Sequence, residues 1–460
     1  MQAPDGWLLA IVLTLVVFGT VMIFSASFPQ TADLAGTARF EPLIRQIMYM
    51  LIGLTGMFVA MQIDYHRYAR WAFPAMLAIM LLLLALIIVP GLGTTTYGAK
   101  SWIYIGSISF QPSELAKPVL IMYMATWLTG KRERVRSVTY GLLQFGVLMG
   151  VLVWLLMLEP DLGTSVLLVT IGAAMFFVSG AQIVQFVGTL LIGGAAFMAL
   201  ALSASYRRDR LLVFLNPDGD LRNLGWQLFQ ARLALGSGGL LGLGLGASRQ
   251  KFSWLPAAHH DAIFAVIGEE LGLVGCALVL LLFVAFAWRG YTIARNSRDS
   301  LGYLVAVGIT TWIIFQAAFN IGGVTLAVPF TGIPLPFVSA GGTALVVTLT
   351  SVGVLLNVSR QANLQPIAQS AASAATTTST TRTRPPSPQK PRATAVRAPA
   401  HRPARTSARA VRSRAGADAA APIKVSAPQN RRQPARAASA ASRQQGSTSA
   451  RASGNRNDWN

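Results

Sequence analysis

The chain has 460 residues, of which 53% are hydrophobic and 12% are charged, and its mean hydropathy is +0.51. These values exclude a single soluble core and indicate a protein that crosses a membrane several times. Of the net charge of +21, a net +15 belongs to residues 361–460, so the basic balance describes a tail and gives no reason to expect nucleic-acid binding. The one cysteine, Cys276, excludes an intrachain disulfide.

Apolar segments of membrane-spanning length recur along the chain. A hydrocarbon core about 30 Å thick needs about 20 apolar residues per helix. The residues before the first segment hold no Lys or Arg, which favours an uncleaved membrane helix over a secretory signal peptide. The pattern predicts an all-α polytopic membrane protein with ten transmembrane helices, at 7–26, 43–62, 71–90, 113–129, 138–158, 161–179, 182–204, 262–288, 301–325 and 335–358.

The distribution of Lys and Arg predicts that both termini are cytoplasmic, because cytoplasmic loops are enriched in these residues. This orientation makes 205–261 a large extracytoplasmic loop. Apolar spacing within it predicts a helix on the membrane surface at 221–235, and a glycine-rich stretch, 236–246, follows. The loop is nevertheless cationic, which binding of an anionic ligand would explain; its seven cations are Arg207, Arg208, Arg210, Arg222, Arg232, Arg249 and Lys251.

The composition changes abruptly after Arg360 and divides the chain into two regions. Residues 1–360 form the predicted membrane domain. Residues 361–460, rich in Arg, Ala, Pro and Ser, cannot bury a core and are predicted to be a disordered cytoplasmic tail. Such a tail suits anionic lipid or an acidic partner, and equally a solubilising role without a specific partner.

Asp261 ends a polar run immediately before an apolar segment and is the first candidate for a catalytic carboxylate. Ionisable groups at membrane depth are costly and mark sites of binding or transfer, although a helix N-cap is the simpler alternative. His259 and His260 precede it, but no ligand spacing indicates zinc. Glu269 and Glu270 lie about 12 Å further along the helix and are expected to organise the bundle.

Three other polar groups stand beside apolar segments. Glu114 and Lys117 share one helix face, either as a self-neutralising pair or facing a cavity beside Asp261. Asp161 follows Glu159 in a tight turn, where it could cap a helix, belong to a cation site or support the active site. Asn320 precedes a stretch, 329–342, whose prolines and glycines predict a fixed irregular backbone, buried or lining a cavity.

Several motifs in order resemble one known family. They are FQPSELAK at 110–117, EPDLG at 159–163, SRQK at 248–251, VIGEELGLVG at 266–275, NIG at 320–322 and TGIPLPF at 331–337. Together they resemble the SEDS family, the peptidoglycan glycosyltransferases of the FtsW, RodA and SpoVE kind, from about residue 7 to 358. The SRQK motif and the long tail are more similar to the FtsW cell-division branch.

The resemblance implies a substrate, lipid II, and a reaction that lengthens a glycan strand held on undecaprenyl diphosphate. It implies a location in the bacterial cytoplasmic membrane, at the division septum, with the active site on the extracytoplasmic side. It also implies partners: a class B penicillin-binding transpeptidase, other division proteins and membrane lipids.

The resemblance also implies roles for individual residues. Asp261 matches the family's catalytic aspartate, with Glu114 and Lys117 as further catalytic groups, and Arg45-Gln46 matches an Arg-Gln pair of the second helix. Lys117, Arg45 and Lys100 would offset the diphosphate charge, and a divalent cation, Mg or Mn, held by Asp261 and Glu114 is left open. The other substrate-binding candidates are Trp102, Arg249, Lys251, His259, Asn320, Ser339, Gly341 and Gly342, and the supporting ones are Glu159, Asp161, Glu269 and Glu270.

The chain departs from the family pattern at Ser101, Ala257, Ala262 and Ala340. These departures keep open a non-catalytic division scaffold. A lipid II flippase is the other alternative. The enzyme is favoured over the flippase because most candidate ionisable groups fall at the outer ends of the predicted helices, where an outward cavity suffices.

Overall fold

The computed structural model describes residues 3–31, 36–89, 93–96, 99–106, 108–130, 141–202, 205–216, 224–252, 254–256 and 258–362. All of them lie within one compact unit, Met1–Thr383. The basic tail lies outside the described residues, so its disorder and the division at residue 360 stay predictions.

Each of the ten predicted segments coincides with a helix. These helices are α1 Gly6–Thr31, α2 Glu41–Gln62, α3 Tyr65–Ile88, α4 Pro112–Gly130, α5 Leu143–Leu158, α6 Leu162–Val178, α7 Ile183–Leu202, α10 Ile263–Arg295, α11 Ser300–Val324 and α12 Gly342–Ala362. The last begins seven residues later than predicted, because 335–341 is a non-helical turn.

In the part of the chain that the structure describes, fewer helices have the length and hydropathy of a membrane span than were predicted to cross the membrane. Among the described residues, six helices are long and apolar enough to cross a membrane: α1, α2, α3, α10, α11 and α12. Helices α5 and α6 are apolar but shorter than 18 residues, and α4 carries an acid and a base in its first two turns. The chain is therefore a multi-pass helical membrane protein for which a count of ten spans stays a prediction.

A small antiparallel sheet, which the sequence analysis did not predict, connects α3 to α4. Its strands are β1 Thr94–Thr96, β2 Ala99–Ile105 and β3 Ile108–Phe110, in that spatial order. Ile105 pairs with Ile108 across a tight turn at Gly106, whose φ is 63°. A glycine reaches this φ without the steric cost of a side chain.

The loop at 205–261 is also more ordered than predicted. Its described residues form two helices, α8 Ser205–Leu215 and α9 Leu224–Ser237. Helix α9 corresponds to the helix predicted at 221–235, whose first three residues lie outside the described residues. Leu228, Ala231 and Ala234 of α9 are buried, and the helix packs against α10. At least one face of α9 is therefore covered by protein.

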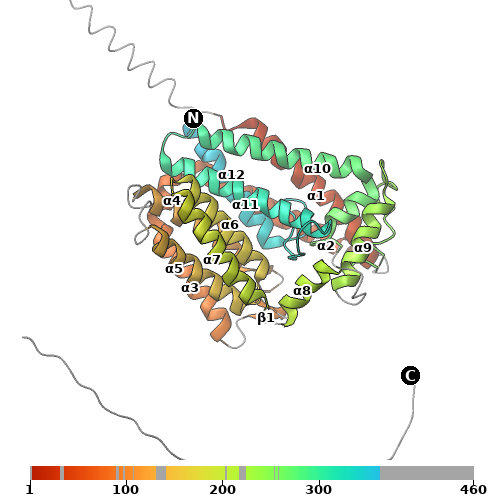
Figure 1. Ribbon diagram of the computed structural model, residues 1–460. Helices are drawn as coiled ribbons and strands as arrows, with labels where there is room; N and C mark the ends of the chain where they lie inside the picture. The colour runs from red at the N-terminus through yellow and green to blue at the C-terminus, as the bar shows by residue number, and fades with distance from the viewer. Residues whose placement is uncertain are drawn as a thin grey trace, which may run out of the picture. The chain divides into compact units, whose positions relative to one another are not determined.

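Helix α11 runs through the middle of the bundle, in contact with α4, α6, α10 and α12 (Figure 1). Helix α12 packs most extensively along α2. A Cβ at Gly353 would lie 2.2 Å from the carbonyl oxygen of Met57, so only glycine permits this approach. Small residues at such crossings are typical of helices that associate in a membrane.

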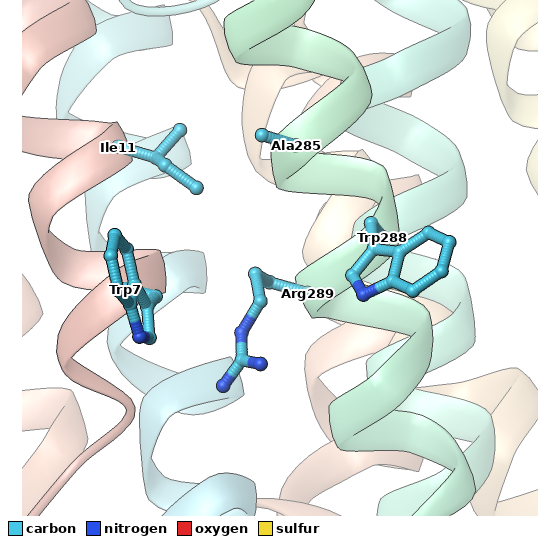
Figure 2. A pocket seen from close by; sticks show the side chains of 5 residues that line it. All are labelled: Trp7, Ile11, Ala285, Trp288 and Arg289. Carbon is cyan, nitrogen blue, oxygen red and sulfur yellow. The ribbon is translucent and has the colours of Figure 1, made fainter.

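Trp7 of α1 and Trp288 of α10 flank Arg289 at one end of the bundle (Figure 2). Both tryptophans are more than 70% exposed, and the guanidinium of Arg289 pairs with Asp5. They line a surface cavity of about 280 Å³. Tryptophan and arginine gather where a bilayer meets water, so this end of α10 marks one membrane boundary.

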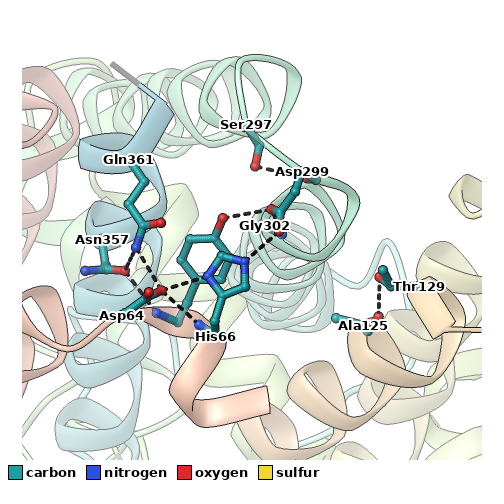
Figure 3. A network of polar contacts seen from close by, with 10 residues as sticks. Asp64, His66, Ala125, Thr129, Ser297, Asp299, Gly302, Asn357 and Gln361 are labelled. Atoms are coloured by element: carbon teal, nitrogen blue, oxygen red, sulfur yellow. Dashed lines mark hydrogen bonds and ion pairs between the residues drawn. The ribbon is translucent and has the colours of Figure 1, made fainter. Parts of the chain in front are cut away.

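A polar network joins three helix ends (Figure 3). Nδ1 of His66 contacts Oδ1 of Asp64 and its Nε2 contacts Oδ2 of Asp299, each at 2.8 Å. Gln361 near the end of α12 donates to Oδ1 of Asp64 at 2.9 Å. Burial alone would raise the pKa of Asp64, but the hydrogen bonds from Gln361 and His66 outweigh it and bring the pKa to about 2. The network fixes the start of α3 against α11 and α12.

Candidate active site

Asp261 is held by two neighbouring helices just before α10. Its Oδ1 accepts a hydrogen bond of 3.3 Å from Nε2 of Gln227 on α9. Its backbone oxygen accepts one of 2.8 Å from Nδ2 of Asn320 on α11. The N-cap position of α10 is Ala262, so capping is not the role of Asp261. The side chain remains available for chemistry.

A cation lies beside this acid. A Cβ built on Gly332 would lie 3.6 Å from Oδ2 of Asp261 and 3.8 Å from both terminal nitrogens of Arg210, so the two groups flank one point. Burial raises the pKa of the Asp261 carboxyl, while the charges of His260 and Arg210 and the hydrogen bond from Gln227 oppose the rise. The net shift is upward, toward the range in which a carboxylate becomes a useful base.

The 331–340 segment forms the other wall beside Asp261, with the fixed irregular backbone that its prolines and glycines predict. Arg210 donates to the carbonyl oxygen of Thr331 at 2.8 Å, and Asn320 donates to that of Ile333 at 2.8 Å. Nδ1 of His260 donates to the carbonyl oxygen of Ala340 at 2.5 Å. Side chains from α8, α11 and the Asp261 turn therefore hold this segment in place.

Three substrate-binding candidates, Ser339, Gly341 and Gly342, lie at the junction of the 331–340 segment and α12, where they contact other residues of the protein. Ser339 accepts a hydrogen bond of 2.8 Å from the backbone nitrogen of Leu335 and so closes the turn. Gly341 directly precedes α12, and its carbonyl oxygen accepts from the backbone nitrogen of Leu345 at 2.8 Å in the first turn of that helix. A Cβ at Gly342 would lie 2.4 Å from the ring of Tyr49.

Glu114 and Lys117 form a buried ion pair on α4. Nζ of Lys117 lies 2.7 Å from Oε1 of Glu114 and 3.2 Å from Oε1 of Gln316. Gln316 in turn donates to the carbonyl oxygen of Pro334 at 3.0 Å. The ion pair and Asp261 thus have different hydrogen-bond partners. The 331–340 segment connects them, because Gln316 bonds to Pro334 and Asn320 bonds to both Ile333 and Asp261.

Glu159 and Asp161 lie in the turn between α5 and α6. Asp161 caps α6, since Oδ1 accepts from the nitrogen of Thr164 at 3.0 Å, and its Oδ2 accepts from Ser113 on α4 at 3.2 Å. Glu159 is 1% exposed, and neither carboxylate oxygen has a partner among the described residues. Burial, and to a lesser degree the charge of Asp161, raise the pKa of Glu159 to about 8.

Glu269 and Glu270 hold the SRQK turn. Glu269 accepts from Oγ of Ser248 at 2.5 Å and from the backbone nitrogen of Arg249 at 2.9 Å. Glu270 pairs with Nζ of Lys251 at 2.7 Å, and both side chains are about 1% exposed or less. These contacts agree with an organising role for the two glutamates, and they make Lys251 a buried ion-pair partner. The side chain of Arg249 is exposed.

The remaining candidates are dispersed over the bundle. Arg45 is exposed and pairs with Glu41 at 2.5 Å, whereas Gln46 is buried. Trp102 lies in β2 opposite Thr94, and the side chain of Lys100 in the same strand is outside the described residues. Their roles in substrate binding stay predictions.

His259 lies two residues before Asp261, in the turn that leads into α10. Burial lowers its pKa to about 4, helped by the charge of His260, so its ring is neutral at physiological pH. Among the described residues no three His, Cys, Asp or Glu side chains form a group that could hold a metal ion. A divalent cation held by Asp261 and Glu114 stays a prediction.

Sequence reasoning missed three residues that the structure brings to this region: Arg210, Gln227 and Gln316. Arg210 had one signal, the excess of cations in the outer loop, but nothing distinguished it from six neighbours. Gln227 and Gln316 had none, because neutral amides at helical positions are common and only their contacts reveal their role.

Relatives of known name match most of the chain. Stage V sporulation protein E of Bacillus subtilis (strain 168) is 42% identical over 359 residues, which cover 78% of this chain and 97% of that protein. A probable peptidoglycan glycosyltransferase FtsW of Trichlorobacter lovleyi is 38% identical over 363 residues, covering 79% and 95%.

Solved structures share the fold. One, described as "Structural coordination of polymerization and crosslinking by a peptidoglycan synthase complex", matches with a TM-score of 0.66 and 28% identity and covers 79% of this chain and 99% of its own. The rod shape determining protein RodA of Thermus thermophilus matches with a TM-score of 0.58 and 28% identity, covering 78% and 97%. The fold therefore defines a multi-pass membrane protein of the RodA-like class.

The family match spans the whole membrane domain. Residues 6–364 match the family FtsW/RodA/SpoVE, described as "Cell cycle protein". The chain belongs to this family, the SEDS family, as its motifs indicate.

Proposed function

We propose that the chain is a peptidoglycan glycosyltransferase that polymerises lipid II at the outer face of the cytoplasmic membrane. The observation that carries the proposal is the position of the Asp261 carboxyl and the Arg210 guanidinium on either side of Gly332. Glycosyl transfer from a diphosphate needs both groups in one place: a base for the attacking hydroxyl and a cation for the departing phosphates. The name of the Trichlorobacter lovleyi relative supports this chemistry.

Asp261 acts as the general base. The 4-hydroxyl oxygen of a GlcNAc unit attacks the anomeric carbon of the growing strand, and its proton passes to the Asp261 carboxylate. The bond from that carbon to the diphosphate oxygen breaks, and its electron pair leaves with undecaprenyl diphosphate. Attack opposite the leaving group inverts the anomeric centre and forms a β-1,4 link. The raised pKa of Asp261 increases its proton affinity and so suits it to this step.

Arg210 offsets the charge of the departing diphosphate. A diphosphate is already a good leaving group, so the site needs positive charge more than a proton donor. A guanidinium presents two parallel donors that match phosphate oxygens. Lys117, Arg45 and Lys100 were expected in this role. Arg210 is the cation whose position beside Asp261 supports it.

We further propose that the enzyme works in cell division beside a class B penicillin-binding transpeptidase, with its termini in the cytoplasm. The matched structure of a peptidoglycan synthase complex and the FtsW relative support this arrangement. The SRQK motif and the long basic tail favour the division branch.

The test uses purified full-length protein, its transpeptidase partner and labelled lipid II. Strand formation should be abolished by Asp261→Asn and strongly reduced by Arg210→Gln. Asp209→Asn, an exposed carboxylate on the same helix as Arg210, is the matched control and should retain activity. Equal polymer from Asp261→Asn and wild type would overturn the role of the acid.

The same preparation separates the alternatives. In liposomes, movement of lipid II across the bilayer without polymer would favour the flippase. Recruitment of the transpeptidase without either polymer or lipid movement would favour the non-catalytic scaffold.

A further inference from the structure

Helix α10 is interrupted at Gly272, and a glycine-rich segment of the outer loop fills the gap. Gly272 has φ 65° and ψ −162°, outside the helical range. The backbone nitrogens of Leu243 and Gly244 donate to the carbonyl oxygens of Glu269 and Glu270, at 2.9 and 3.0 Å. Returning bonds of 3.0 and 3.2 Å run from the nitrogens of Leu273 and Val274 to the oxygens of Gly239 and Leu240.

We call residues 238–246 the glycine-rich loop. Its close approach to α10 depends on missing side chains. A Cβ at Gly238 would lie 1.9 Å from the carbonyl oxygen of Gly268, and one at Gly242 would lie 2.1 Å from that of Glu270. These hydrogen bonds satisfy backbone groups of both the glycine-rich loop and α10. Irregular backbone tolerates a non-aqueous setting only when such groups are satisfied within the protein.

In and around the glycine-rich loop, leucine side chains are exposed and several charged side chains are buried, which is the reverse of a water-facing loop. No charged residue occurs between 233 and 248. Lys251, Glu269 and Glu270, on the elements packed against the loop, turn inward and are 3% exposed or less, while the exposed Arg249 and Arg232 lie beyond the two ends of this uncharged stretch. The leucines point outward instead: Leu240, Leu241, Leu243 and Leu245 are 70%, 80%, 42% and 62% exposed. Polar groups inside and leucines outside indicate an apolar surrounding.

The position of the loop along α10 agrees with this polarity. Arg289, beside Trp7 and Trp288, marks one boundary of the bilayer (Figure 2), which is the inner one in the predicted topology. Gly272 is seventeen residues earlier, which at 1.5 Å per residue is about 25 Å along the helix. A hydrocarbon core is about 30 Å thick, so this point falls just inside the outer boundary. Leu273 and Val274, next to the loop, are also about 60% exposed and continue the surface toward Leu281.

We propose that the glycine-rich loop is a re-entrant segment embedded in the outer leaflet, with its four leucines in contact with lipid acyl chains. It interrupts α10 and replaces the lost helical hydrogen bonds, so that the turn carrying Lys251 and the helix carrying Glu269 meet below the membrane surface. The proposal does not depend on the proposed chemistry.

Spin labelling in lipid tests it. Full-length protein carrying Cys276→Ser is given one new cysteine, Leu241→Cys, and reconstituted into vesicles of phosphatidylethanolamine and phosphatidylglycerol. Leu281→Cys, 65% exposed in the middle of α10, is the lipid reference, and Tyr104→Cys, 51% exposed on β2 in the predicted outer connection between α3 and α4, is the water reference. Each label is exposed in turn to oxygen, which concentrates in hydrocarbon, and to a water-soluble nickel chelate.

The ratio of oxygen to nickel collisions at Leu241 should match that at Leu281 and exceed that at Tyr104 several-fold. A ratio equal to that at Tyr104 would place the loop in water and overturn the proposal. Low accessibility to both reagents would show protein cover, such as a second copy, and would overturn it as well. Leu245→Cys gives an independent reading if Leu241→Cys fails to fold, and thermal unfolding of each variant in detergent reports that the fold is kept.

Discussion

Oδ1 of Asp261 accepts a hydrogen bond of 3.3 Å from Nε2 of Gln227, and this contact joins the acid before α10 to helix α9. The 205–261 loop is therefore part of the candidate site, because α9 supplies a donor to the carboxyl and α8 supplies the neighbouring cation. Positions of side chains on these two short helices should control the acidity of Asp261.

Replacement of Gln227 by Leu should move the acidic limb of the pH–rate profile to higher pH. The hydrogen bond favours the charged carboxylate, so its loss raises the pKa of Asp261 further and protonates the base over a wider range. Polymerisation rates measured from pH 5 to pH 9 check this. Leu233→Ala, an exposed change on the same helix, should leave the profile in place, and an unshifted profile in Gln227→Leu would contradict the contact's role.

Replacement of Gly332 by Ala should lower polymerisation strongly. The new methyl group would occupy the point 3.6 Å from Asp261 and 3.8 Å from Arg210, where the proposed mechanism places the reacting groups. Its φ of 73° also adds strain of about 1–2 kcal/mol. Gly180→Ala, with φ 101° and nothing within 4 Å, carries similar strain without the obstruction, so it should lose stability but keep activity. Equal activity of the two variants would place the reaction elsewhere.

Removal of Lys117 should destabilise the protein more than removal of the whole pair. Lys117→Met leaves the buried carboxylate of Glu114 unpaired, at a cost of about 3–5 kcal/mol. Adding Glu114→Gln neutralises that charge and should recover much of the loss. Thermal unfolding in detergent measures the cycle. A polymerisation defect that persists in the recovered double variant would show a role beyond stability, whereas recovery of activity would make the pair structural.

Glu159→Gln should remove a pH dependence of stability. The pKa of Glu159 is raised from 4.5 to about 8, so between these values the unfolded chain has lost a proton that the folded chain keeps. Wild-type stability should therefore fall as pH rises through this window, by up to about 1.4 kcal/mol per pH unit. Melting temperatures at pH 5 and pH 8 should show the variant gaining on wild type at the higher pH. A gap that is constant with pH would contradict the raised pKa.

Two glycines of the glycine-rich loop form a matched pair. Gly242 and Gly244 have φ 79° and 103°, but a Cβ at Gly242 would lie 2.1 Å from the carbonyl oxygen of Glu270, and one at Gly244 meets nothing within 4 Å. Gly242→Ala should thus lower the melting temperature well beyond Gly244→Ala, because it separates the loop from α10. Similar losses in both variants would mean that backbone strain, and not the close approach, sets the need for glycine.

The helix bundle was largely predictable. In lipid, the backbone N–H and C=O groups of a long apolar segment must find partners within the segment, and a helix provides them. The ten predicted segments all fall on helices, and Asp161 caps α6, one of the readings left open for it. The sheet escaped prediction because β1 and β3 have only three residues each, and α8 because its eleven residues carry a charged run, 207–210, near their start. Span number was not decided, since α5 and α6 fall below the usual length.

The sequence by itself determined a multi-pass membrane protein of one family, with Asp261 at the head of a helix, because composition and ordered motifs are local properties. Only the tertiary structure decided which residues lie around Asp261. Arg210, Gln227 and Asn320 come from three helices up to 110 positions apart, and Lys251 meets Glu270 inside the bundle and not at its surface. Contacts between distant helices depend on packing geometry, which no local pattern of residues encodes.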